Sequence, residues 1–369
     1  MFQSQNNHPD NTKNTVCDLS IIGSVLYSFL CVVMSSAASV CMRTDGANAV
    51  FTMLVPFFWI ASSYFAVALL IHKKYAVLGA GALGAMLLSI IFTSSPALSA
   101  LSLAPFAAAG AVHVFTQKKY MTQSGIILTA ALCHALFLIA LICILLYQKY
   151  GSVSMESFYR ALDSFSNIAM YLPNIIADIY SDYIADPKVA QTLTEEMLAS
   201  YMEALDQYKA SVAELRQELP KLLISSIPST FLCICAIGGF ITTLGAKKHR
   251  KMVGLEDTIG AYGITPISGI VYLIITLAHI FIDPYSAVGI TLSAIGAALG
   301  LGLALEGLIF MIKVIKRTER RGLFTSLFII AAVIFTTPMI SMLSFVGAYH
   351  TVSLLILEKL NSKRDGDGN

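Results

Sequence analysis

Long apolar stretches separated by short connections run through most of this chain, and positive charge is confined to every second connection. Basic clusters stand at 72–74, 118–119, 247–251 and 313–321, whereas the intervening short connections hold only Arg43 or no basic residue. Cytoplasmic loops of membrane proteins are enriched in Lys and Arg, so this alternation is typical of a chain that crosses a membrane many times. The sequence therefore predicts a polytopic membrane protein.

The composition predicts helices rather than strands. Of the 369 residues, 56% are hydrophobic and 12% are charged, whereas soluble proteins carry roughly 25% charged residues. A lipid-exposed backbone must satisfy its own hydrogen bonds, which a helix does within one segment. We therefore expect an all-α transmembrane bundle in contact with the lipid bilayer. Topology explains the basic clusters, so no nucleic-acid partner is expected.

Nine apolar stretches approach or exceed the roughly 20 residues that a spanning helix needs. They cover 19–42, 51–71, 76–92, 97–115, 124–147, 222–244, 264–282, 286–312 and 323–346. Pro338 lies inside the last stretch, and an amphipathic pattern continues from there to Leu360. Two short passes in this region would give ten spans, so the side of the carboxyl terminus stays open.

The placement of basic residues orients the chain and divides it into segments. The amino terminus is expected in the cytoplasm, and the long segment 148–221 is expected outside. The predicted organisation is a polar amino terminus (1–18), a five-helix bundle (19–147), an external insert (148–221), a four-helix bundle (222–346) and an amphipathic helix with a polar tail (347–369).

The external insert has two helical patterns of its own. Apolar residues recur at helical spacing over 155–179 and again over 189–219, with charged residues on the opposite face of the second run. Asp186 and Pro187 separate the two runs and indicate a break. The insert is therefore predicted to be an extracytoplasmic amphipathic helical hairpin.

Glu306 is the first candidate for a functional residue, because it lies inside an apolar stretch. A carboxylate within the membrane is costly and usually faces the bundle or a cavity. Its proximity to Lys313 leaves an interfacial position as the alternative. A solute site would bring Glu306 together with His113, His134 and Asn174 in one pocket open to the outside.

Other residue patterns have a structural and a functional interpretation. Asp178, Asp182 and Asp186 recur every four residues, so they form either a binding face for a cation or a solvated helix face. Small residues that permit close helix packing are Ser35, Ser39, Gly79, Gly84, Gly296 and Gly300.

Catalytic and metal-binding motifs do not occur in the sequence. There is no GxSxG, Walker A or HExxH motif, and no two histidines within the apolar spans share the i, i+4 spacing of a metal site. Six of the seven cysteines lie in or beside apolar stretches, which is typical of small buried residues rather than disulfides. We expect no enzyme activity, no metal and no cofactor.

The order of these features resembles the YybS-like family, bacterial multi-pass membrane proteins of unknown function. The resemblance begins at LVPFFWIASSYFAVALLIHKKYAVLGAGALGAMLLSIIF (54–92) and continues through SPALSALSLAPFAAAGAVHVFTQKK (95–119). It extends over ITPISGIVY (264–272) and ALEGLIFMIKVIKR (304–317). The closing segment FVGAYHTVSLLILEK lacks the Asp and Arg of the family pattern. The resemblance implies a protein of the bacterial cytoplasmic membrane.

The first half is also similar to the substrate-binding S components of energy-coupling-factor importers. That resemblance implies capture of a small molecule, a vitamin or a metal, and docking on a cytoplasmic ATPase module. Ser35 and Ser39 form a small-xxx-small pair that matches a helix-docking role in that family.

Two hypotheses on function follow. The first is a transport-related protein with a small-molecule cavity between its helices, whose ligand the sequence does not identify. The alternative is a membrane scaffold or regulatory factor that binds a membrane-protein partner through the external hairpin. A membrane enzyme is the weakest hypothesis, because no catalytic pair is visible.

Overall fold

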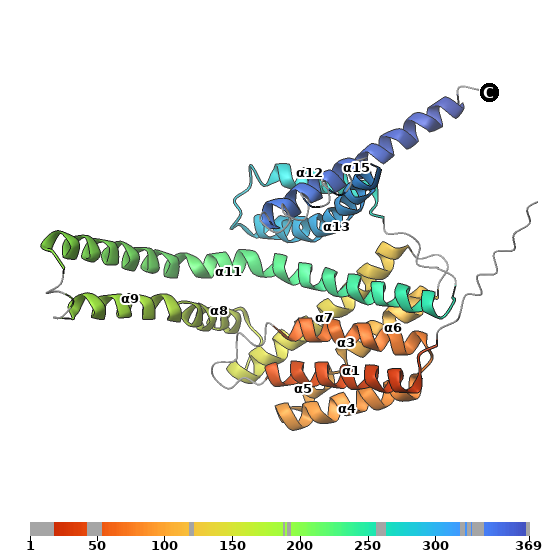
Figure 1. The fold of residues 1–369 in the computed structure, drawn as a ribbon, viewed down its shortest axis with the longest axis horizontal. Helices are drawn as coiled ribbons and strands as arrows, with labels where there is room; N and C mark the ends of the chain where they lie inside the picture. Colours follow the sequence, from red (N-terminus) through yellow and green to blue (C-terminus); the bar gives the residue numbers. More distant parts are fainter. Residues whose placement is uncertain are drawn as a thin grey trace, which may run out of the picture. The chain divides into compact units, whose positions relative to one another are not determined.

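All elements that the structure describes are helices (Figure 1). The computed structural model describes residues 18–42, 54–117, 122–186, 189, 193–255, 263–317, 322, 326 and 336–366, and these ranges contain no strand. The prediction of an all-helical fold is confirmed. The chain divides into two units, residues 1–137 with 237–261 (unit 1) and residues 138–236 with 262–369 (unit 2).

Seven apolar stretches in the described part of the chain are long enough to cross a membrane. They are α1 (Ile21–Cys41), α4 (Tyr75–Thr93), Pro96–Thr116 (α5, Pro96–Leu101, with α6, Ala104–Thr116), α7 (Gln123–Tyr150), α11 (Glu195–Met252), α13 (Ala287–Arg317) and Met339–Leu357 of α15 (Thr336–Gly366). The apolar helices α3 (Val55–Ile71) and α12 (Pro266–Ala278) are shorter. The predicted count of nine or ten spans therefore stays a prediction.

Local sequence signals set the helix ends in unit 1. The Ser20 hydroxyl accepts the Gly23 N–H at 3.0 Å and caps the start of α1. Pro56 stands in the first turn of α3, where its missing N–H costs no helical hydrogen bond. Ser94 ends α4 in the left-handed conformation (φ 52°), and Ser95 with Pro96 then begins α5.

Helices α1, α3, α4 and α6 form the packed part of unit 1 together with the first half of α7 and the end of α11. Helix α1 packs against α3 and α4, and α3 packs against α6. The buried core combines apolar side chains with small polar ones, and its members include Cys31, Ala66, Val67, Ala109, Val112, Ile126, Ala130 and Ala246. By contrast, Ile21 and Ile22 are each 82% exposed on α1, which suits a helix that faces lipid.

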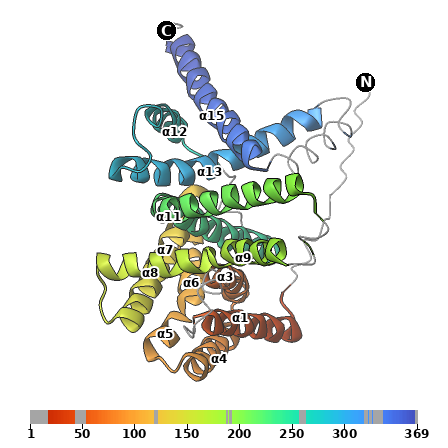
Figure 2. The same cartoon turned by 90° about the vertical axis from the view of Figure 1, so that its left-hand side faces the viewer.

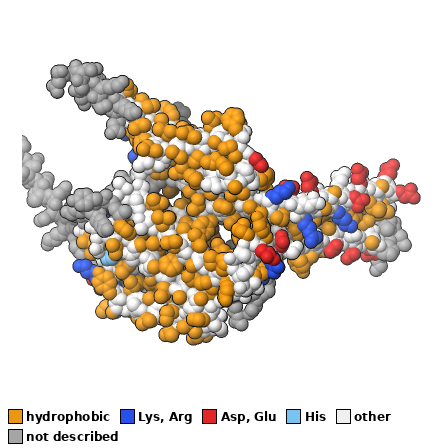
Figure 3. Space-filling view, turned by 180° about the vertical axis from the view of Figure 1, so that it is seen from behind, with side chains coloured by type: hydrophobic (Ala, Val, Ile, Leu, Met, Phe, Trp, Pro, Cys, Tyr) orange, Lys and Arg blue, Asp and Glu red, His pale blue; other side chains and the backbone are white. Residues whose placement is uncertain are grey.

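Within unit 2, the segment predicted as an external insert contains two short helices and the start of a long one, whereas the sequence predicts two helices. Its first part is two helices, α8 (Met155–Ala169) and α9 (Tyr171–Ala185), joined at Met170. The Tyr208 hydroxyl donates to the Pro173 carbonyl at 3.3 Å and links α9 to α11. Charged side chains gather over α9 and the first half of α11, whereas apolar side chains cover most of the other visible surface (Figure 3).

Helix α11 does not end where the sequence indicates an end. The spacing predicts one helix up to Leu219 and a separate span from Leu222, yet α11 continues without interruption and contains Pro220 and Pro228. A proline removes only one backbone donor, and apolar side chains continue at helical spacing on both sides of it. The amphipathic part and the apolar part are therefore one helix.

The last three labelled helices, α12, α13 and α15, pack on one another (Figures 1 and 2). Most of the first half of the predicted ninth span (323–346) lies outside the described residues. Pro338 falls in the first turn of α15, a position that tolerates proline, and the helix then extends to Gly366. Its apolar stretch is Met339–Leu357, which lies further along the chain than predicted.

Candidate functional site

Helices α13 and α15 of unit 2 approach each other closely at two glycines. A Cβ atom on Gly307 would overlap the Leu343 carbonyl, and one on Gly347 would overlap the Leu303 carbonyl. Small residues of this kind let two backbones come together in a membrane bundle. The side chain that follows or precedes each glycine is therefore held close to the opposite helix.

Glu306 stands next to Gly307 and is buried by this packing. Only 7% of the residue is exposed. Its Oε1 lies 3.3 Å from Nδ1 of His350 on α15, within ion-pair distance. The Phe310 ring covers the imidazole, with ring centroids 4.5 Å apart and an angle of 37°. A carboxylate and an imidazole thus face each other between two apolar helices.

The pair is not fully satisfied by its neighbours. Neither Glu306 Oε2 nor His350 Nδ1 has a hydrogen-bond partner among the described residues. The nearby Ser344 hydroxyl donates to the Gly300 carbonyl at 2.8 Å. Buried polar atoms are nearly always paired, so an open carboxylate oxygen calls for an explanation. Its lone pairs can accept a proton or a hydrogen bond from a ligand.

The structure distributes the four predicted site residues over both units. Glu306 and Asn174 belong to unit 2, and His113 and His134 belong to unit 1. The Gln117 amide lies 3.0 Å from His113 Nε2 within α6. His134 is 3% exposed and packs against Gly238 of α11. Asn174 is exposed on α9. Each therefore has a local setting of its own, and their predicted convergence remains a prediction.

The acidic side chains of the insert are exposed. Asp178 and Asp182 lie on α9, and Asp186 is the residue that follows its last turn. Among the residues that the structure describes, no group of three or more His, Cys, Asp or Glu side chains could hold a metal ion. None of the six described cysteines forms a disulfide bond. The cation-binding interpretation of the acidic face stays a prediction.

The predicted packing residues lie at helix interfaces with one exception. Ser35 and Ser39 are buried on α1, and added Cβ atoms on Gly296 and Gly300 would meet α12 side chains at 3.1 Å. At Gly84 the nearest neighbour would be Val32, at 3.4 Å. At Gly79 an added Cβ would meet nothing within 4 Å.

The close approach of α4 to α1 falls on Gly81 instead. A Cβ atom there would come within 2.6 Å of the Ser28 hydroxyl. Spacing along one helix does not distinguish Gly79 from Gly81, because the choice depends on which face the neighbouring helix covers.

His350 is the residue of the candidate site that the sequence did not indicate. It lies in the segment predicted to be an amphipathic helix with a polar tail, where an exposed histidine is ordinary and indicates no site. One signal was present in the sequence: Glu306 adjoins Gly307, and His350 follows Gly347 by three residues. An ionisable residue within one helical turn of a glycine, in each of two separate apolar helices, is a pattern that points to a crossing.

The described residues define a class: they are all-helical and contain seven helical stretches that are long and apolar enough to cross a membrane. Comparison with known proteins adds no narrower assignment, since no family model, no curated protein and no solved structure matches the chain. The resemblance to the YybS-like family and to importer S components therefore remains a prediction from the sequence.

Proposed function

We propose that this protein is a transport-related membrane protein that binds a small solute at Glu306 and His350. The observation that carries the proposal is the unpartnered carboxylate oxygen of Glu306, which is buried between α13 and α15. Ionisable residues inside membrane helices are rare, cost roughly 2.5–3.5 kcal/mol on insertion scales, and commonly mark a solute or proton path. A solute that donates hydrogen bonds, or carries positive charge, suits this pair.

The proposal includes the topology that the sequence predicts. All nine apolar stretches cross the bacterial cytoplasmic membrane, with the amino terminus in the cytoplasm. The alternation of basic clusters supports this orientation. Segment 148–221 then forms an extracytoplasmic hairpin, supported by the hydrogen bond between Tyr208 and Pro173. A cytoplasmic ATPase module is the partner that the S-component resemblance implies.

The test is purification of the protein from native membranes in mild detergent, with mass spectrometry of the small molecules that accompany it. We expect a bound metabolite with the wild type and a loss of that metabolite in Glu306→Gln. Glu203→Gln is the matched control, because Glu203 is exposed on α11 and bonds only Gln207 of the same helix. Equal recovery of the metabolite from both variants would contradict the proposed site.

A second function has an observation of its own. Exposed aromatic and aliphatic side chains stand on α9, where Tyr171, Leu172 and Ile179 are 68%, 64% and 61% exposed. A scaffold that binds a membrane-protein partner through the hairpin would use such a face. The same purification tests it: a protein partner that disappears when residues 154–219 are deleted, with no bound metabolite, favours the scaffold.

A further inference from the structure

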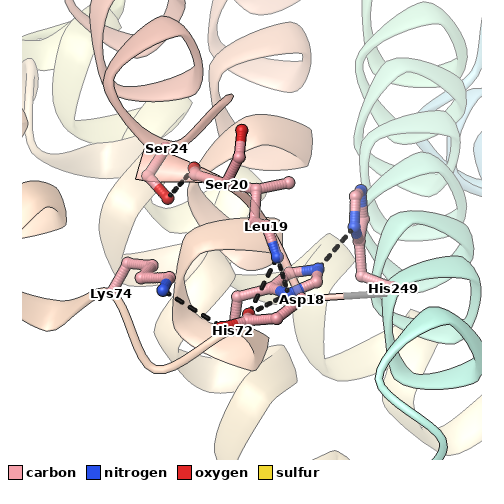
Figure 4. A network of polar contacts seen from close by, with 7 residues as sticks. All are labelled: Asp18, Leu19, Ser20, Ser24, His72, Lys74 and His249. Carbon is pink, nitrogen blue, oxygen red and sulfur yellow. Dashed lines mark hydrogen bonds and ion pairs between the residues drawn. The ribbon is translucent and has the colours of Figure 1, made fainter. Parts of the chain in front are cut away.

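A chain of polar contacts in unit 1 joins three segments that are far apart in the sequence (Figure 4). Asp18 precedes α1, His72 follows α3, and His249 lies in the last turn of α11. Asp18 Oδ1 is 3.1 Å from His72 Nδ1, and His72 Nε2 is 3.2 Å from His249 Nδ1. Lys74 adds an ion pair of 3.2 Å to the other Asp18 oxygen.

The chain of contacts runs from water into the packed interior. The Asp18 side chain is 61% exposed, whereas His72 and His249 are 5% and 1% exposed. The rings of Tyr27 and Tyr64 stand edge-on to the His249 ring, with centroids 5.8 Å and 5.9 Å away. A proton taken up at the outer end can therefore reach a site whose inner end is closed.

Hydrogen-bond chemistry allows only one arrangement of protons at a time. The Leu19 nitrogen lies 3.2 Å from His72 Nδ1 but donates its N–H to Asp18 Oδ1 at 2.8 Å, so Nδ1 can carry the proton that the Asp18 carboxylate accepts. With the proton on Nδ1, His72 Nε2 accepts the Nδ1–H of His249. The reverse arrangement would leave the His249 Nε2–H as a buried donor, and that nitrogen has no hydrogen-bond partner among the described residues.

One additional proton breaks this arrangement. Protonated His72 carries N–H groups on both nitrogens. Its bond to His249 then persists only if His249 moves its own proton from Nδ1 to Nε2, which would leave a buried N–H donor with no hydrogen-bond partner among the described residues. Asp18 supports the charged state, because hydrogen bonds from His72 and then Lys74 lower the pKa of its carboxyl. Among the described residues, the titratable and charged groups around the two imidazoles include Asp18, Tyr27, Tyr64, Lys73, Lys74, Lys248 and Arg250, and Arg250 acts electrostatically on His113 of α6.

We propose that Asp18, His72 and His249 form a proton-operated latch on the carboxyl-terminal end of α11. While both imidazoles are neutral, the latch ties this end to the turn after α3. Uptake of one proton by His72 strengthens its contact with Asp18, weakens its bond to His249 and loosens the last turn of α11, where His249 lies. The latch is independent of the solute site proposed at Glu306.

Hydrogen–deuterium exchange of the full chain in lipid nanodiscs tests the latch. Exchange is followed at about pH 8 and about pH 5.5, on either side of the ordinary histidine range, and corrected with an unstructured peptide. We expect the amides of His249–Met252 to lose protection by roughly three- to tenfold on acidification, as loss of one hydrogen bond implies. Protection in α4 should not change.

Variants separate the latch from general acid effects. His72→Phe and His249→Phe should abolish the pH response, whereas His279→Phe, which removes a histidine of unit 2 that lies beside Ser293, should keep it. Unchanged wild-type protection at the two pH values would overturn the latch, and so would an equal response in His249→Phe. If a variant does not fold, the wild-type comparison alone decides.

Discussion

Among the described helices, the interface of α1 with α3 and α4 and the interface of α13 with α15 both bury polar side chains, and they do so differently. Where α1 meets α3 and α4, neutral hydroxyls pair with one another: Ser35 with Ser62 at 3.1 Å and Ser39 with Ser89 at 2.8 Å. Where α13 meets α15, an ionisable pair is buried instead, and Glu306 keeps an oxygen with no hydrogen-bond partner among the described residues.

The comparison distinguishes an interface that only holds helices together from one whose side chains can bind a solute. Two hydroxyls that share a hydrogen bond are both satisfied without burying a charge, so such pairs stabilise the packing of one helix on another. A carboxylate beside an imidazole carries a desolvation cost that packing alone does not require. Both interfaces contain small residues, and only the unsatisfied ionisable group distinguishes the one that we assign to solute binding.

The largest effect on stability is expected when one member of the ionisable pair between α13 and α15 is removed. His350→Phe leaves the Glu306 carboxylate buried without its partner, and loss of one partner of a buried pair typically costs about 3–5 kcal/mol. Thermal unfolding in detergent should show a large drop in Tm. The double variant Glu306→Leu with His350→Phe should recover most of the loss; a double variant as unstable as the single one would contradict the pair.

The second prediction concerns the glycines that bring α13 and α15 together. Gly347→Ala places a methyl group against the Leu303 carbonyl, and overpacking of this kind costs about 1–3 kcal/mol. Gly79→Ala is the control, because nothing lies within 4 Å of its added methyl. That variant should be neutral or gain up to about 1 kcal/mol from helix propensity. Equal effects at both positions would contradict the crossing.

A smaller effect is expected at the serine interface. Ser35→Ala leaves the Ser62 hydroxyl without the side chain that it faces, although that hydroxyl can still donate to the Cys31 carbonyl at 3.3 Å. The expected loss is about 1 kcal/mol, the usual value of a neutral hydrogen bond. Thermal unfolding of Ser35→Ala, and of the double variant that adds Ser62→Ala, measures this loss of stability. A loss as large as that of His350→Phe would remove the distinction between the interfaces.

The smallest effect is expected at Asp18, which is exposed to water. Hydrogen bonds from His72 and then Lys74 lower the pKa of this carboxyl in the folded protein. The unfolded chain therefore binds the proton first as pH falls. The stabilisation is complete above the ordinary aspartate range and is lost as pH drops through the folded pKa. Asp18→Asn should remove this acid-dependent part of Tm, and an unchanged acid profile would contradict it.

Much of the helical architecture was predictable because its signals are local. The cap at Ser20, the prolines that open α3 and α5, and the long apolar stretches all act within a few residues of the backbone that they control. The uninterrupted course of α11 and the extent of α15 were not predictable. Proline at 220 reads as a boundary, yet the rest of the helix is continuous around it.

The candidate site was half predictable. Glu306 is conspicuous in the sequence, because a carboxylate in an apolar stretch has no local explanation. His350 is not, because its importance depends entirely on which residue of another helix it faces. The same holds for His72 and His249, which are 177 residues apart in the chain and 3.2 Å apart between ring nitrogens.

The sequence by itself determined that this protein is helical and apolar, with its positive charges placed in alternate connections. Those properties follow from composition and from patterns that repeat within a single helix. The tertiary structure decided which helices meet, at which glycines, and therefore which ionisable side chains become partners. The physical reason is that the free energy of a buried charge depends on the charges and hydrogen bonds around it, and the groups that supply them come from distant parts of the chain.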